Sequence, residues 1–141
     1  MISILFLCTG NSCRSQMAEG LCRHLRGDVM DPSSAGIENR GLNPLAVRAM
    51  REIGIDISGQ RSKTVDELDQ REYDYVVTVC TGAVEACPFF PARLGVVHHG
   101  FDDPPKLAEG SSSEEEAMVH YRRVRNEIRD FVTTLPDSLQ D

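Results

Sequence analysis

A cysteine and an arginine lie close together near the start of the chain, in the segment Cys8-Thr9-Gly10-Asn11-Ser12-Cys13-Arg14-Ser15. The segment follows an apolar run and precedes a helical pattern, so its backbone N–H groups and a helix N-terminus can surround an anion. The Arg14 guanidinium can hold two oxygens at once. The same positive field favours the thiolate of Cys8, which is the nucleophilic form. The sequence therefore predicts a nucleophilic Cys8 in an oxyanion-binding loop formed by Thr9, Gly10, Asn11, Ser12, Cys13, Arg14 and Ser15.

A Cys-x5-Arg pattern alone specifies only two residues, and the alternative is a buried cysteine beside a surface arginine. The small and polar residues between Cys8 and Arg14 favour the oxyanion loop. Ser15 has two interpretations, because its hydroxyl can cap the helix or hydrogen-bond the Cys8 thiolate.

Two further cysteines, Cys80 and Cys87, are separated by six residues at the end of a second apolar run. This is not Cys-x2-Cys spacing, and a zinc site with His98 and His99 is disfavoured because neighbouring strand residues point to opposite faces. Each cysteine alone could be a small core residue. Together, beside a strand end that should face Cys8, they suggest serial thiol–disulfide exchange without a metal.

Asp103 precedes a proline after the last predicted strand. An aspartate at the mouth of the site can act as general acid toward a leaving oxygen. The alternative is a solvated turn formed by the sequence Asp102-Asp103-Pro104-Pro105.

The elements that position these groups alternate along the chain. Apolar runs predict strands at residues 2–7, 75–80 and 94–97, with a short strand ending near residue 34. Helical periodicity predicts helices at residues 15–26, 44–53 and 113–135, and Thr64 with Glu67 forms a capping-box pattern. Residues 106–116 are expected to form a loop. This alternation indicates an α/β fold with a parallel sheet, whose carboxyl edge should bring Cys8, Cys80 and Asp103 together.

The chain has 141 residues and predicts a single domain, residues 1–141. A net charge of −7 argues against nucleic acid as a partner. No apolar run could span a membrane, and the first run is too short for a signal peptide. We therefore expect a cytoplasmic protein, and nothing in the sequence demands more than a monomer. The five cysteines are an odd number, which argues against a structural disulfide framework.

Nearly the whole chain resembles the thioredoxin-coupled arsenate reductases, which share the low-molecular-weight protein tyrosine phosphatase fold. Besides the oxyanion loop and the pair Cys80 and Cys87, the resemblance lies in Gln16-Met17-Ala18-Glu19-Gly20, Ser34-Ala35-Gly36-Ile37-Glu38 and Gly100-Phe101-Asp102-Asp103-Pro104.

The resemblance implies four parallel strands in the order 2-1-3-4 with helices on both faces. It implies that Cys8 attacks arsenate and that Asp103 helps an oxygen leave as water. Cys80 would then attack the Cys8 adduct and release arsenite. Cys87 would attack Cys80, and thioredoxin or another thiol reductant would reduce the resulting disulfide. Asn11 and Ser15 match the residues that support the loop, and no cofactor beyond the external reductant is implied.

Two other functions share this chemistry. A phosphotyrosine phosphatase would use the same loop, but such enzymes usually have aromatic residues after the Asp-Pro pair, where this chain has Pro105, Lys106 and Leu107. A non-enzymatic oxyanion or redox sensor is the other alternative.

Two details of this chain lead to further expectations. Lys63 stands where some relatives have an acidic potassium ligand. We expect either that its ammonium pairs with Glu19 instead or that it is a solvated lysine near a helix start. We also expect residues 80–87 to be partly helical in the reduced protein and extruded in the oxidised one.

Overall fold

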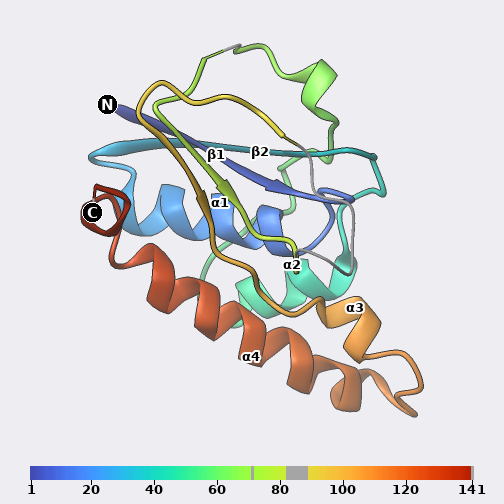
Figure 1. The fold of residues 1–141 in the computed structure, drawn as a ribbon. Helices are drawn as coiled ribbons and strands as arrows, with labels where there is room; N and C mark the ends of the chain where they lie inside the picture. The colour runs from blue at the N-terminus through green and yellow to red at the C-terminus, as the bar shows by residue number, and fades with distance from the viewer. Residues whose placement is uncertain (71, 82–88, 141) are drawn as a thin grey trace.

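Four strands form the parallel sheet that the sequence predicts: β1 (Ile2–Cys8), β2 (Met30–Gly36), β3 (Tyr75–Thr78) and β4 (Gly95–His98). Their order is β2-β1-β3-β4, which confirms the expected topology. The computed structural model describes residues 1–70, 72–81 and 89–140 (Figure 1). β1 pairs with a neighbour on each side. Its residues from Ile4 to Leu7 are all apolar and fully buried, which is typical of a strand covered on both faces.

Three α-helices pack on one face of the sheet: α1 (Arg14–Arg26), α2 (Pro44–Arg51) and α4 (Glu114–Val132). Figure 1 shows them together on one side, with the 3-10 helix η1 (Val65–Glu67) on the other. Among the described residues, that second face is covered by η1 and by Leu68, Tyr73, Phe90 and Ala92. Helices were expected on both faces of the sheet. Within the described residues, one face carries the α-helices and the other carries the short 3-10 helix η1.

Local capping explains where the helices begin. The Asn43 side chain accepts hydrogen bonds from the backbone N–H groups at the start of α2, and Ser113 does the same for α4. Thr64 and Glu67 form the predicted capping box at η1. A further short 3-10 helix, η3 (Asp137–Leu139), follows α4. No helix in the described part of the chain is long and apolar enough to cross a membrane.

Several predicted boundaries differ from the structure. β3 ends at Thr78, so Cys80 lies beyond the strand, and β4 begins and ends one residue later than predicted. The predicted loop at residues 106–116 is limited to residues 108–113. A short helix, α3 (Pro104–Leu107), precedes it because proline fixes the backbone angle that a first helical turn needs. The first turn of α4 follows it, since acidic residues stabilise a helix N-terminus.

Candidate active site

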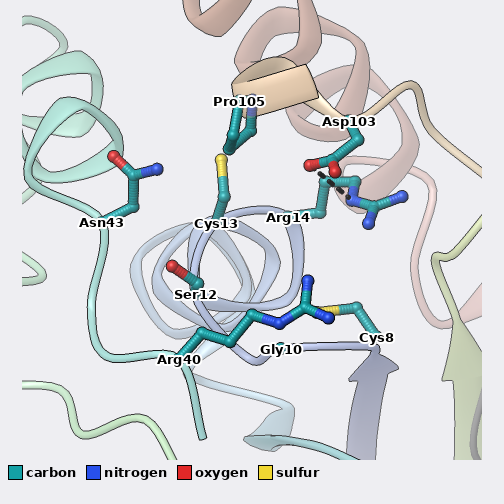
Figure 2. Close-up of a pocket in the computed structure, with 9 residues that line it drawn as sticks. All are labelled: Cys8, Gly10, Ser12, Cys13, Arg14, Arg40, Asn43, Asp103 and Pro105. Atoms are coloured by element: carbon teal, nitrogen blue, oxygen red, sulfur yellow. Dashed lines mark ion pairs between the residues drawn. The ribbon is translucent and has the colours of Figure 1, made fainter. Parts of the chain in front are cut away.

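A pocket of about 160 Å³ lies at the carboxyl edge of the sheet, where Cys8 ends β1 and the oxyanion loop leads into α1. Segments from three parts of the chain meet there, as predicted for a parallel sheet. Figure 2 shows the side chains that line it: Cys8, Gly10, Ser12, Cys13, Arg14, Arg40, Asn43, Asp103 and Pro105.

The Asn11 side chain holds the oxyanion loop from within. Its backbone has a φ of 48°, in the left-handed region that asparagine tolerates better than most residues. Its amide nitrogen donates to Ser15 Oγ (2.8 Å), and its amide oxygen accepts from the Lys63 backbone N–H (2.9 Å). Gln16 Nε2 donates to the Asn11 side chain and carbonyl oxygens. Because Asn11, Ser15 and Gln16 are fully buried, these hydrogen bonds are not shared with water.

The end of β2 holds the loop from outside. The backbone N–H groups of Ile37 and Glu38 both donate to the Thr9 carbonyl. A Cβ at Gly36 would lie 2.7 Å from the Thr9 carbonyl oxygen and 2.8 Å from the Asn11 nitrogen. Only glycine therefore allows this close approach of the two backbones.

The Cys8 sulfur lies 2.8 Å from Ser15 Oγ. Since Ser15 Oγ accepts a hydrogen bond from Asn11, its own proton is free to point at the sulfur. A thiolate at Cys8 can accept that hydrogen bond. No side chain caps the start of α1, so of the two interpretations of Ser15 the structure shows the contact with Cys8.

Arg14 is buried at the first position of α1, with a side chain 4% exposed. Its Nη1 donates to the Phe101 carbonyl (3.1 Å), and its Nε lies 3.7 Å from Asp103 Oδ1. The segment after β4 thus orients the guanidinium. Asp103 lines the pocket with a side chain 29% exposed, a position from which a carboxyl group can reach a leaving oxygen.

Cys80 is buried on the sheet side of the loop. Thr9 Oγ1 donates to its sulfur at 3.9 Å, and the Cys80 sulfur lies 3.9 Å from the Leu7 carbonyl oxygen. The residues before and after Cys8 therefore both contact Cys80. Cys87 lies outside the described residues, as do residues 82–86 of the segment that is predicted to change shape.

Two further thiols are buried in α1 or beside it. Burial and the nearby Asp103 carboxyl raise the pKa of Cys13 well above its ordinary value, so Cys13 lines the pocket as a neutral thiol. Cys22 packs in the core, and burial raises the pKa of its thiol to about 12.

The predicted pair between Lys63 and Glu19 is wrong. Glu19 pairs with Arg23, one helical turn further along α1 (2.8 Å), and accepts a hydrogen bond from Ser34 Oγ (2.5 Å). Lys63 Nζ donates to the Arg61 carbonyl (3.0 Å), and burial lowers the pKa of its ammonium.

The two histidines considered for a zinc site have different neighbours. His98 Nδ1 lies 2.7 Å from Thr78 Oγ1, whereas the His99 ring stacks on Phe101 and lies against Phe131. Within residues 1–70, 72–81 and 89–140, no group of three histidine, cysteine or acidic side chains is placed to hold a metal ion.

Sequence reasoning missed Gln16, Arg40, Asn43 and Pro105 as site residues. Asn43 caps α2, and its side chain also donates to Tyr121 Oη across the fold (3.1 Å), a contact that the sequence does not show. Gln16 adjoins the loop but faces it only because α1 begins at Arg14. Arg40 lies far from Cys8 in sequence, and only the fold brings it to the pocket.

Comparison with known proteins agrees with this geometry. The family model described as low molecular weight phosphotyrosine protein phosphatase matches residues 3–141. The arsenate reductase of Halalkalibacterium halodurans is 53% identical over 135 residues, covering 96% of this chain and 95% of that protein. That of Bacillus subtilis is 51% identical over 125 residues, covering 89% and 88% of the two chains.

Solved structures give the same result. An arsenate reductase in the phosphate binding state superimposes with a TM-score of 0.78 at 30% identity, over 98% of both chains. A low molecular weight protein tyrosine phosphatase from T. tengcongensis shares the fold, with a TM-score of 0.73 at 23% identity over 98% of this chain and 99% of that chain. The fold, the loop and these matches together show that the chain belongs to the low molecular weight phosphotyrosine protein phosphatase family.

Proposed function

We propose that this protein reduces arsenate to arsenite through a relay of Cys8, Cys80 and Cys87. The observation that carries the proposal is the second thiol: Cys80 is buried against the loop that presents Cys8, and Thr9 contacts its sulfur. A phosphatase needs one nucleophilic sulfur, whereas reduction of an oxyanion needs a second sulfur to accept the first. The names of the relatives that are about half identical support this choice.

The first step is substitution at arsenic. The Cys8 thiolate attacks arsenate held by the loop amides and Arg14, and a sulfur–arsenic bond forms. One arsenate oxygen takes up protons, one of them from Asp103, and leaves as water. Arsenic stays pentavalent in the adduct.

The second step is the reduction. The Cys80 thiolate attacks the Cys8 sulfur, and the sulfur–arsenic bond breaks. Its electron pair stays on arsenic, which leaves as trivalent arsenite, and a Cys8–Cys80 disulfide remains. Cys87 then attacks Cys80 and releases the Cys8 thiolate. Thioredoxin supplies the two electrons and two protons that reduce the Cys80–Cys87 disulfide, in a cytoplasm that keeps thiols reduced.

Weak phosphatase activity is the second candidate function, because Cys8, Arg14 and Asp103 would serve phosphoryl transfer in the same way. The pocket argues against a phosphotyrosine substrate, since none of the described side chains that line it is aromatic.

Turnover with a coupled reductant tests the proposal. With arsenate, thioredoxin, thioredoxin reductase and NADPH, we expect many turnovers per protein and arsenite as product. Cys80→Ser should lose arsenite release and keep hydrolysis of p-nitrophenyl phosphate. Cys8→Ser should lose both, and Cys22→Ser, a core control, should keep both. A single turnover in the wild type, or arsenite release by Cys80→Ser, would contradict the relay.

A further inference from the structure

We infer that Arg40 is a specificity-determining residue at the oxyanion pocket, which favours a free inorganic oxyanion over an ester of the same acid. The inference deepens the proposed function, because it concerns which arsenate-like anions the site accepts. Arg40 lines the pocket beside Cys8 and Arg14 but belongs to neither the loop nor the segment that carries Asp103.

The fold holds Arg40 directly on the loop. Its backbone N–H donates to the Gly10 carbonyl (3.1 Å). A Cβ at Gly10 would lie 2.6 Å from Arg40 Cδ and 3.0 Å from its Cγ, so the side-chain stem lies flat on the Gly10 backbone. Figure 2 shows the guanidinium directed toward Cys8. The packing of the Arg40 side chain on Gly10 thus places its positive charge at the pocket.

The two guanidinium groups of the pocket differ in how they are bound. Arg14 is buried and is held by the Phe101 carbonyl and Asp103. Arg40 is 55% exposed and donates through Nε to Glu38 Oε2 (2.8 Å). Its two terminal nitrogens make no hydrogen bond within the described residues. They can therefore donate to a bound anion without breaking the pair with Glu38.

An inorganic oxyanion and its ester differ at one oxygen. The loop amides and Arg14 can hold three oxygens of either anion. The fourth oxygen of free phosphate or arsenate is an unsubstituted acceptor, and a second guanidinium in the same pocket can bind it. In an ester this oxygen carries an organic group and is a poor acceptor, so Arg40 gains nothing from it. Because the chain has a net charge of −7, a local cation also matters for attracting a small anion.

Binding of two anions to the reduced protein tests this assignment. Inorganic phosphate and phenyl phosphate are titrated by calorimetry into Cys8→Ser protein, which should not hydrolyse the ester, with and without Arg40→Gln. Loss of one charge-assisted hydrogen bond predicts that the phosphate Kd rises about tenfold in Arg40→Gln. The phenyl phosphate Kd should change less than about twofold, since its fourth oxygen is substituted.

Two variants serve as controls. Arg93→Gln removes the same charge from an exposed arginine that precedes β4 and pairs with Asp74, and it should leave both Kd values unchanged. Glu38→Gln frees Arg40 from its carboxylate and should tighten phosphate binding. Equal weakening of both anions in Arg40→Gln, or an unchanged phosphate Kd, would overturn the inference.

Arsenate kinetics give a second readout. In Arg40→Gln, KM for arsenate should rise about tenfold, because a hydrogen bond to bound arsenate is lost. The binding experiment does not depend on reduction. If the wild type fails to turn over arsenate, the proposed function fails while the preference for phosphate over phenyl phosphate is still decided.

Discussion

Polar side chains hold two regions of this molecule together, but in opposite surroundings. In the oxyanion loop, Asn11, Ser15 and Gln16 are fully buried and hydrogen-bond to one another. Between α2 and α4, exposed ion pairs join Glu52 to Arg122 and link Arg48 to the first turn of α4. The loop side chains are buried from solvent, whereas solvent reaches the ion pairs between the helices.

This difference in burial predicts that substitutions in the two regions have different effects. Removing a partner inside the loop leaves a buried polar group unpaired, at a cost of about 1–3 kcal/mol, and displaces the groups that bind substrate. Removing an exposed charge between α2 and α4 changes little, because water and salt already screen it. Changes in the loop should therefore affect activity, whereas changes between the helices should affect only stability and its dependence on pH and salt.

Arg14→Lys should have the largest effect. Lysine keeps the charge but cannot hold two oxygens in one plane, and charge develops on those oxygens during the reaction. We expect kcat to fall about 100-fold or more, with the melting temperature little changed. Arsenate reduction at saturating substrate measures this. A near-normal kcat would mean that the loop amides alone suffice.

Gly36→Ala should be the next largest, although it removes no functional group. The new Cβ would press on the backbone of Thr9 and Asn11, and a displacement of the loop by a fraction of an ångström weakens catalysis. Both activity and melting temperature should fall. Gly59→Ala is the control, because a Cβ there meets nothing within 4 Å. If the two variants behaved alike, close approach at Gly36 would not matter.

Asn11→Ala should reduce both the stability of the fold and the binding of phosphate. It leaves the Lys63 N–H without its acceptor, removes one of the oxygens to which Gln16 Nε2 donates, and puts alanine at a φ of 48°. We expect a loss of about 2 kcal/mol or more in the free energy of unfolding, together with weaker phosphate binding. Urea unfolding measures the first. Asn39→Ala, which removes an exposed turn hydrogen bond to Gly41, should cost far less.

Glu52→Gln should have the smallest effect. The hydrogen bond and charge of Arg122, with Arg125, lower the pKa of Glu52 from 4.5 to about 2. This pairing stabilises the folded state above pH 4.5 and is lost as the pH falls from 4.5 toward 2. The variant should lose a few degrees of melting temperature at pH 7 and no activity. Its stability should fall less than that of the wild type between pH 5 and pH 3, since Gln does not titrate.

The sequence predicted the parts of the site that are local in the chain. The loop from Cys8 to Ser15 and the strand order follow from an apolar run, a helical pattern and a resemblance. Arg40 could not be found this way, because its place depends on how the end of β2 passes over Gly10. The pairing of Glu19 was within reach, since Arg23 lies four residues along the same helix and Lys63 does not.

The burial of Cys22 protects its thiol from chemical modification in the folded protein. With no exposed surface and a pKa near 12, its sulfur stays protonated and sheltered at neutral pH. Alkylating reagents and peroxide therefore spare it in the folded protein, since both react with thiolates. The wild-type chain can be labelled at its site without first replacing this background cysteine. Alkylation or oxidation of Cys22 would therefore report that the core has opened.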